Sequence, residues 1–277
     1  MFNKVFKYDF KYVFRFWWIF AVATAGLSVL AGLLIRSMVT MSEMQIYNFL
    51  ASFLSTMGIA AIIMIIGVFP IVALVACIVR YYKNLFSDEG YLTFTLPVKR
   101  SIHLNSKILN YVVFETMSVL VIILDILLIL IIGSKSFFSE IIPGISQFFA
   151  TIAKSWSIWL TFDVILVPIL LLVYTLMSIN LYYLSITIGS VISNRHKVLA
   201  SIGVYLGMSA VMSFLQQIIS YFTVDTLLQS NLFLSEFGNV SESLTIYLFL
   251  CTLLYGGISV AIYYINLYCI RNKLNLS

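Results

Sequence analysis

The sequence predicts an all-α membrane protein with six transmembrane helices. Composition, the length of the apolar runs and the placement of charges all lead to this fold class. Of the 277 residues, 62% are hydrophobic and 10% are charged. A soluble domain is about 45–50% apolar and about 25% charged. One soluble core cannot bury so much apolar side chain, whereas a bilayer solvates it. Residues 1–277 are therefore expected to form a single transmembrane domain.

Six apolar runs are long enough to cross a bilayer as helices, which takes about 20 residues each. These runs are Trp17–Ile35, Met57–Val79, Leu109–Ile132, Trp159–Ile188, Val198–Phe222 and Leu244–Ile270. Each run is continuously apolar, unlike the alternating strands of a membrane barrel. The outer connections between the runs are short, so no extracellular domain is expected.

Basic residues lie mainly on one side of this topology. That side holds 13 of the 16: Lys4, Lys7, Lys11, Arg15, Arg80, Lys83, Lys99, Arg100, Lys107, Arg195, Lys197, Arg271 and Lys273. Loops rich in Lys and Arg stay in the cytoplasm, so both termini are expected there. The net charge of +5 follows from this bias, and no nucleic-acid partner is expected.

The N-terminal segment, residues 1–16, has the pattern of an amphipathic helix. Apolar side chains recur at helical spacing beside a basic stripe, at Phe2, Val5, Phe6, Phe10 and Val13. Such a helix is expected to lie in the cytoplasmic headgroup layer and to contact membrane lipid. The alternative is a simple positive-inside anchor. Asp9 falls near the apolar face, and the pattern offers it no partner.

Motifs for enzyme chemistry are missing from the sequence. It has no Gly-x-x-x-x-Gly-Lys-Ser/Thr loop for nucleotide phosphates, no His-Glu-x-x-His metal site and no Gly-x-Ser-x-Gly elbow. The two histidines, His103 and His196, fall in different loops. The chain is therefore not expected to be an enzyme or to hold a metal or cofactor.

The connection over residues 80–107 is far longer than two helices require. It places charges beside the apolar side chains Leu85, Phe86, Leu92, Phe94 and Leu96. A contiguous apolar patch of this size is costly to expose to water. The segment is suited to docking into a groove of a partner protein. The alternative is a loop folded onto its own helix ends.

This connection resembles a known family. Its pattern is Arg80-x-x-Lys83-Asn84-Leu85-x-Ser87-Asp88-Glu89-Gly90-Tyr91-Leu92-x-Phe94-Thr95-Leu96-Pro97, followed by Ser106-Lys107. It is similar to the permease subunits of type-2, exporter-type ATP-binding cassette transporters of clostridia and other Gram-positive bacteria. The resemblance implies an amphipathic helix before six spans and short re-entrant helices in the outer loop at 223–243. It also implies that 80–107 is a coupling loop, with Asp88, Glu89, Gly90, Tyr91 and Pro97 at or near a separate ATPase subunit.

The same resemblance implies a function and partners. The chain would be a permease in the bacterial plasma membrane, pairing with a second or paralogous permease. ATP and Mg would be bound by the partner ATPases. The cargo would be amphiphilic, such as an antimicrobial peptide, a lantibiotic or a lipid-like molecule, and its export would confer peptide or multidrug resistance. The alternative is an ATP-independent channel or a proton-coupled carrier that uses intramembrane carboxylates.

Polar residues inside the spans are candidate pathway residues, because a charge at depth costs about 2.5–3.5 kcal/mol on insertion scales. The candidates are Glu115, Asp125 and Asn180, with Asp163 at the start of the fourth span. Asp125 has two open interpretations, a pathway residue or a structural hydrogen-bonding group. A polar stripe on the fourth span, at Thr175, Ser178, Tyr182 and Ser185, favours contacts between helices.

Small residues form two stripes that allow helix backbones to approach closely. The first span carries Ala21, Ala25, Ser28 and Gly32, and the fifth carries Gly203 and Gly207. Either stripe is expected to serve a dimer interface or packing within one subunit.

Overall fold

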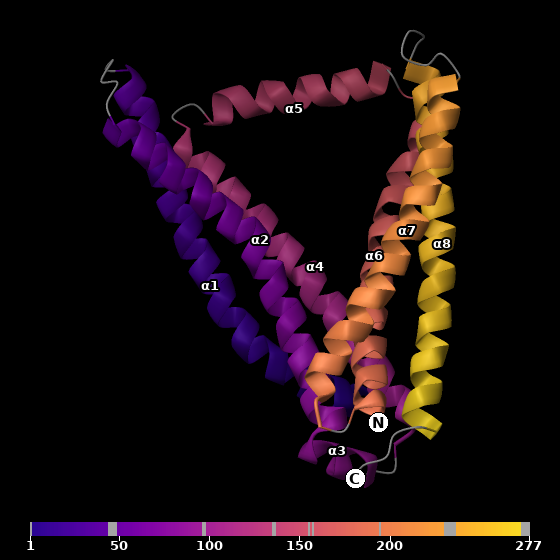
Figure 1. Cartoon of the computed structure of the whole chain (residues 1–277). Helices are drawn as coiled ribbons and strands as arrows, with labels where there is room; N and C mark the ends of the chain where they lie inside the picture. The colour runs from indigo at the N-terminus through magenta and orange to yellow at the C-terminus, as the bar shows by residue number, and fades with distance from the viewer. Residues whose placement is uncertain are drawn as a thin grey trace. The chain divides into compact units, whose positions relative to one another are not determined.

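The computed structural model describes residues 2–43, 49–95, 98–134, 137–154, 156, 158–193, 195–229 and 237–272. Within these ranges the chain forms eight helices and no strand (Figure 1). They are α1 (Phe2–Glu43), α2 (Phe49–Phe86), α3 (Asp88–Thr95), α4 (Arg100–Gly133), α5 (Phe137–Lys154), α6 (Ile158–Ile192), α7 (Lys197–Gln229) and α8 (Phe237–Asn272).

Six of these helices, α1, α2, α4, α6, α7 and α8, are long and apolar enough to cross a membrane. They expose large side chains such as Ile63 at 65%, Leu199 at 74% and Leu253 at 59%. Acyl chains solvate such groups, whereas water does not. The predicted all-helical class with six spans is confirmed, and the chain has the character of a multi-pass membrane protein.

The separate interfacial helix expected over residues 1–16 is not confirmed. α1 runs from Phe2 to Glu43 without a break. Its first glycine is Gly26, and it contains no proline to interrupt the backbone hydrogen bonds. Local sequence therefore gives this helix no reason to end where the apolar span begins.

The helices fall into two compact units. Unit 1 comprises Met1–Arg80 and Leu109–Ala150, and unit 2 comprises Tyr81–Ile108 and Thr151–Ser277. Unit 1 thus holds α1 with most of α2, α4 and α5. Unit 2 holds α3, α6, α7 and α8 with the end of α2, the start of α4 and the end of α5. Because α2, α4 and α5 each contribute to both units, the division does not follow the helix boundaries.

The core of unit 1 contains two clusters of side chains, one of aromatic rings and one of aliphatic groups. Trp17 of α1 lies 5.6 Å from the Phe69 ring of α2 and 6.1 Å from the Phe114 ring of α4. Its indole N–H donates to Ser118 Oγ at 2.8 Å, so the ring is buried without losing its hydrogen bond. Nearer the other end of these helices, Ala31, Ile65 and Ile129 form a second cluster.

The small-residue stripe of α1 packs within the chain. A Cβ on Gly32 would come within 2.8 Å of Ile132 Cβ on α4, and a Cβ on Gly133 within 3.2 Å of Ile35 Cγ2 on α1. Ala21 and Ser28 are buried on the same helix. In this unit the second of the two expected roles, close packing inside one subunit, accounts for Gly32.

In unit 2, α6 contacts both α7 and α8. Its core joins Met177, Leu181 and Leu184 of α6 to Cys251, Tyr255 and Ile262 of α8. α6 and α7 approach each other tightly at Gly189, where a Cβ would collide with the backbone of Ser201. Only a glycine allows this approach, because any side chain carbon would occupy the same space.

Two segments that were expected to be short outer loops differ from that expectation. The connection between the third and fourth spans contains the 18-residue helix α5. In the segment 223–243, the described residues extend α7 to Gln229 and begin α8 at Phe237. Residues 230–236, where part of the expected re-entrant structure falls, lie outside the described residues.

Candidate functional site

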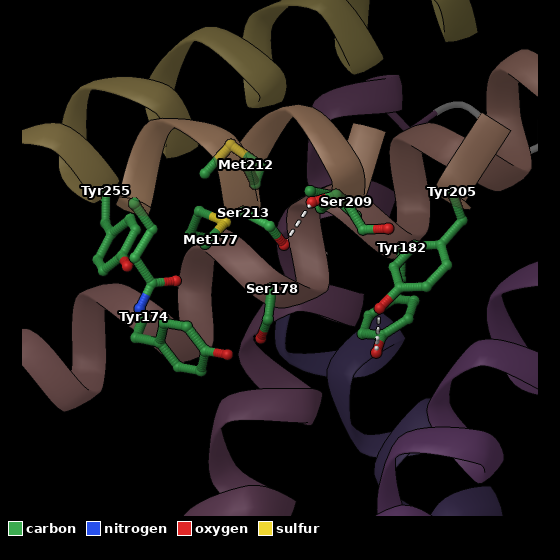
Figure 2. Close-up of a pocket in the computed structure, with 11 residues that line it drawn as sticks. Tyr174, Met177, Ser178, Tyr182, Tyr205, Ser209, Met212, Ser213 and Tyr255 are labelled. Atoms are coloured by element: carbon green, nitrogen blue, oxygen red, sulfur yellow. Dashed lines mark hydrogen bonds between the residues drawn. The ribbon is translucent and has the colours of Figure 1, made fainter. Parts of the chain in front are cut away.

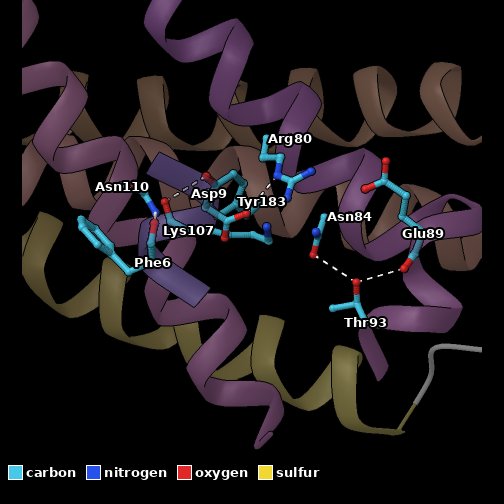
Figure 3. Close-up of polar contacts among 9 residues, drawn as sticks. All are labelled: Phe6, Asp9, Arg80, Asn84, Glu89, Thr93, Lys107, Asn110 and Tyr183. Atoms are coloured by element: carbon cyan, nitrogen blue, oxygen red, sulfur yellow. Dashed lines mark hydrogen bonds and ion pairs between the residues drawn. The ribbon is translucent and has the colours of Figure 1, made fainter. Parts of the chain in front are cut away.

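The connection between α2 and α4 contains the short helix α3. α2 ends at Phe86, and the Gly90 N–H donates to the Ser87 carbonyl at 2.7 Å, which closes the turn into α3. The Thr93 hydroxyl lies 3.3 Å from Asn84 Oδ1 on α2 and 3.0 Å from the Glu89 carbonyl (Figure 3). Since Thr93 is 8% exposed, this contact is sheltered from water. α3 is thereby attached to the last turns of α2.

The five expected coupling residues differ in their exposure and in whether the structure describes them. Glu89 is exposed and Gly90 is buried. Asp88 and Tyr91 lie in α3, but their side chains are outside the description, as is Pro97 altogether. Glu89 is thus the one of the five whose side chain is both described and exposed.

The apolar side chains of this connection are partly used within the chain. Leu85 is 1% exposed and Phe86 is 6% exposed. The Phe86 ring lies 5.6 Å from that of Tyr81. For these two residues the burial fits the alternative expectation, a segment folded onto its own helix ends. The side chains of Leu92 and Phe94, and residue Leu96, lie outside the described part.

Asp9 has a partner that the sequence pattern did not reveal. Its Oδ1 lies 2.9 Å from Arg80 Nε, and the Arg80 guanidinium lies 4.6 Å from the Tyr12 ring centroid, all within unit 1. The two side chains of the ion pair are 5% and 18% exposed. The pair joins positions 71 residues apart, so helical spacing cannot show it. The available signal was an acidic residue on an apolar face, which requires a cation nearby.

In unit 2, the end of α2 is bonded to α6 and α8. Tyr81 stacks on Tyr183 of α6 with 3.9 Å between ring centroids. Its hydroxyl lies 2.9 Å from Thr187 Oγ1, and the Thr187 hydroxyl also lies 2.8 Å from Asn266 Oδ1 on α8. A buried polar chain of this kind fixes the rotation of each helix, because every partner loses a hydrogen bond if one turns away.

The start of α4 is bonded to the same two helices. The Tyr183 hydroxyl donates to the Lys107 carbonyl at 3.3 Å (Figure 3). The Tyr263 hydroxyl donates to Asn105 Oδ1 at 2.7 Å. Arg100 Nη1 donates to the carbonyls of Ile270 and Arg271 at 2.6 and 2.7 Å, and so caps the last turn of α8. The helices on both sides of α3 are therefore attached to α6 and α8.

A cavity of about 210 Å³ lies in unit 2 among the middle turns of α6, α7 and α8 (Figure 2). Its lining combines aromatic rings, thioethers and hydroxyl or amide groups: Tyr174, Met177, Ser178, Leu181, Tyr182, Tyr205, Ser209, Met212, Ser213, Gln216 and Tyr255. Pockets that hold amphiphilic molecules have this mixture of apolar walls and a few polar groups.

One wall of the cavity is a pair of tyrosines. Tyr182 and Tyr205 stack with 4.7 Å between centroids, and the Tyr205 hydroxyl donates to the Tyr182 oxygen at 3.1 Å. Figure 2 shows Ser209 and Ser213 on the next turns of α7, where the Ser213 hydroxyl donates to the Ser209 carbonyl. The sequence prediction found Ser178 and Tyr182 on α6. It missed Tyr205, Ser209 and Ser213 on α7, although these hydroxyl groups recur at helical spacing.

The candidate intramembrane polar residues do not form one cluster. Glu115 and Asp125 are ten residues apart on α4, about 15 Å along the axis. Asn180 instead donates to Ser259 Oγ of α8 at 3.1 Å, within unit 2. Asp163 accepts a hydrogen bond from Thr245 at 2.6 Å. Asn180 and Asp163 therefore join α6 to α8 rather than lining the cavity.

Asp125 is the most buried of the three carboxylates. It is 2% exposed, and the hydroxyls of Thr24 and Ser28 on α1 lie within hydrogen-bonding reach of it. Within the described residues, its Oδ2 atom has no hydrogen-bond partner. The hydroxyls fit a structural hydrogen-bonding role, and the unsatisfied oxygen keeps the pathway interpretation open.

The second small-residue stripe differs from the first. A Cβ on Gly203 or Gly207 of α7 would meet nothing within 4 Å. Both glycines are exposed, together with Ala210 on the next turn. Among the described residues, none packs against this face of α7 at the two glycines.

Across the part of the chain that the structure describes, no group of three His, Cys, Asp or Glu side chains is arranged to hold a metal ion. Comparisons with protein-family models, curated proteins and solved structures found no match to this chain.

Proposed function

We propose that this chain is the transmembrane permease subunit of an ATP-driven exporter, powered by a separate ATP-binding cassette ATPase. The observation that carries the proposal is α3, a short helix between the second and third spans whose Glu89 is exposed and whose Thr93 contacts Asn84 of α2. A helix in this position, attached to its neighbours, can receive a push from a partner and pass it on.

The contacts of unit 2 supply a route from α3 to the cavity. α3 contacts α2 through Thr93, and α2 contacts α6 through the stacked rings of Tyr81 and Tyr183. Tyr182, the neighbour of Tyr183 on α6, lines the cavity. Rotation or displacement of α6 by its contact with α2 would therefore reshape the cavity wall. This is the physical basis on which ATP binding would alternate the access of the cargo site.

The cavity fits part of an amphiphilic cargo. Drug-sized pockets measure about 300–1,000 Å³, and this cavity is about 210 Å³. It would accept a large side chain or an acyl segment rather than a whole peptide. The hydroxyls would bind the polar edge of that group. An antimicrobial peptide, a lantibiotic or a lipid-like molecule carries such groups, and we propose these classes as cargo.

The proposed setting is a bacterial plasma membrane with both termini in the cytoplasm, as the excess of Lys and Arg on one side favours. In this orientation α3 faces the cytoplasm, where the ATPase subunits and their ATP and Mg are. A second permease copy or a paralogous permease would complete the transporter, and the open Gly203–Gly207 face of α7 is one surface for that contact.

The experiment is a pull-down of the tagged chain from its native membrane in a gentle detergent, with mass spectrometry and an ATPase assay. The test variant carries Asp88→Ala and Glu89→Ala, and the matched control is Thr95→Ala at the exposed end of the same helix. We expect the parent and the control to retain a stoichiometric ATPase and the test variant to lose it. A clean preparation without ATPase that still transports would overturn the proposal.

The alternative function, an ATP-independent channel or proton-coupled carrier, is favoured by one observation, the buried Asp125 with its unsatisfied Oδ2. Asp125→Asn separates the two functions. A proton-coupled carrier would lose pH-dependent flux in proteoliposomes, because the variant cannot exchange a proton at that position. An ATP-driven permease would retain flux that depends on ATP and the ATPase subunit.

A further inference from the structure

The helix α5 has no role in the proposed function, and its sequence is strongly amphipathic. Among its described side chains, Ile145, Phe148, Phe149 and Ile152 fall within an arc of about 100° at 100° per residue. The polar residues Ser146, Gln147, Thr151 and Lys154 fall on the remaining surface. The apolar spacing continues toward the N-terminus in the sequence with Phe137, Phe138, Ile141 and Ile142.

The described residues of the chain leave the apolar face of α5 exposed. Ile145 is 51% exposed, Phe148 is 62% exposed and Phe149 is 63% exposed. The two phenylalanine rings contact each other edge to face, with 5.8 Å between centroids. Adjacent exposed aromatic side chains of this size mark a surface that contacts a membrane or another protein.

The short connections at both ends of α5 determine its depth relative to the membrane. Residues 134–136 join it to α4 and residues 155–157 join it to α6, and both neighbours are membrane-spanning helices. Three extended residues reach at most about 11 Å. Since α4 ends and α6 begins on the same side of the membrane, both ends of α5 stay near that boundary.

The length of α5 then fixes its direction. A helix of 18 residues is about 27 Å long, so an upright helix would carry one end far beyond the reach of its connection. α5 must therefore lie along the membrane plane. Trp156, in the connection to α6, is 54% exposed. Tryptophan is enriched at the level where headgroups meet acyl chains, so its position agrees with this depth.

We propose that α5 is an interfacial helix whose Ile145–Phe149 face is immersed in the lipid bilayer, on the side opposite to α3. The occupant of this face is lipid, because the two short connections hold the helix at headgroup level. The helix carries one acidic residue, Glu140, and one basic residue, Lys154, so its net charge is zero. Its immersion is therefore driven by apolar burial and does not require anionic lipid. The inference rests on the membrane-spanning character of α4 and α6 and is independent of the proposed transport function.

The test places a nitroxide label on the full-length protein in single-chain nanodiscs of phosphatidylcholine. Phe148→Cys reports on the apolar face, and Gln147→Cys, one residue away on the polar face, is the matched control. The parent protein, with Cys77, Cys251 and Cys269, sets the background labelling. The measurement is relaxation of the label by oxygen, which enters the acyl region, against a water-soluble nickel chelate.

We expect the label at Phe148 to show several-fold less chelate accessibility and more oxygen accessibility than the label at Gln147. Equal chelate accessibility at the two positions would overturn the proposal. A second pair, Phe149→Cys and Thr151→Cys, repeats the comparison where one variant fails to fold. Protection at Phe148 that exists in multi-chain proteoliposomes and vanishes in single-chain discs would assign the face to a second copy of the chain and overturn lipid as the occupant.

Discussion

Units 1 and 2 are both built around long apolar helices, but their interiors are filled differently. In unit 1, α1, α2 and α4 meet through the rings of Trp17, Phe69 and Phe114 and cross closely at Gly32. In unit 2, α6 and α7 are as close at Gly189, yet farther along they separate around a cavity lined by hydroxyls. Long apolar helices thus meet through aromatic rings in unit 1, and in unit 2 they also line a candidate binding cavity. Four predictions test this division of roles.

The largest expected effect is on the ion pair of unit 1. Arg80→Ala removes the ion-pair partner at 2.9 Å from the buried Asp9 carboxylate, and we expect it to reduce the free energy of unfolding by about 3–5 kcal/mol. Asp9→Ala together with Arg80→Ala should recover part of this loss, because the buried carboxylate that lost this ion pair is then removed as well. Thermal unfolding in detergent, followed by near-UV circular dichroism, measures both. A double variant no more stable than Arg80→Ala would show that the pair is not the source of the effect.

The next largest expected effect concerns the tight approach of α6 to α7 at Gly189. Gly189→Ala places a methyl group against the backbone of Ser201, and we expect a loss of about 3 kcal/mol, the upper end for overpacking. Gly203→Ala is the matched control on α7, where the added carbon meets nothing within 4 Å. That control should gain up to about 1 kcal/mol from helix propensity. Equal stability of the two variants would contradict the α6–α7 packing described above.

The third prediction compares one variant in each unit, one expected to impair cargo binding and the other expected to impair stability. Ser178→Leu fills part of the cavity, so we expect loss of cargo binding, measured by cargo-induced thermal stabilisation, with a change in stability below about 1 kcal/mol. Ser118→Ala in unit 1 removes the acceptor of the Trp17 N–H and should cost about 1–3 kcal/mol while cargo binding is retained. If Ser118→Ala abolished cargo binding and Ser178→Leu did not, the roles assigned to the two units would be reversed.

The different interiors of the two units were only partly predictable from the sequence. The six spans are a local property of apolar runs, and the hydroxyls at Ser178 and Tyr182 were evident as a polar stripe on one helix. The cavity itself depends on how α7 is rotated against α6, which Gly189 and Ser201 determine through a tertiary contact. The pairing of Asp9 with Arg80 depends likewise on which helices become neighbours. No local pattern contains that information.

The helix α5 was missed for a different reason. Its apolar residues lie on one side of the helix and its polar residues on the other. The segment therefore contains no run of about 20 apolar residues and does not meet the length criterion for a membrane span. Pro143 and Gly144 in its middle are residues that usually interrupt a helix. The amphipathic period was nevertheless present in the sequence. The amphipathic spacing between the third and fourth spans therefore predicts α5, even though the segment is not apolar enough to be a span.

The smallest expected effect concerns the tyrosine pair of the cavity. Tyr205→Phe keeps the stacked ring and removes only the hydroxyl that donates to Tyr182, so we expect a loss of about 0.5–1.5 kcal/mol in unfolding free energy. Tyr263→Phe, which removes a more exposed bond to Asn105, is the control and should cost less. If the cavity binds the polar edge of its cargo, Tyr205→Phe should also weaken cargo binding, whereas Tyr263→Phe should not. A stability loss at Tyr205 without any change in cargo binding would mean that this hydroxyl only joins α6 to α7. The site would then be narrowed to Ser178, Ser209 and Ser213, whose hydroxyls remain on the cavity wall when the tyrosine bond is removed.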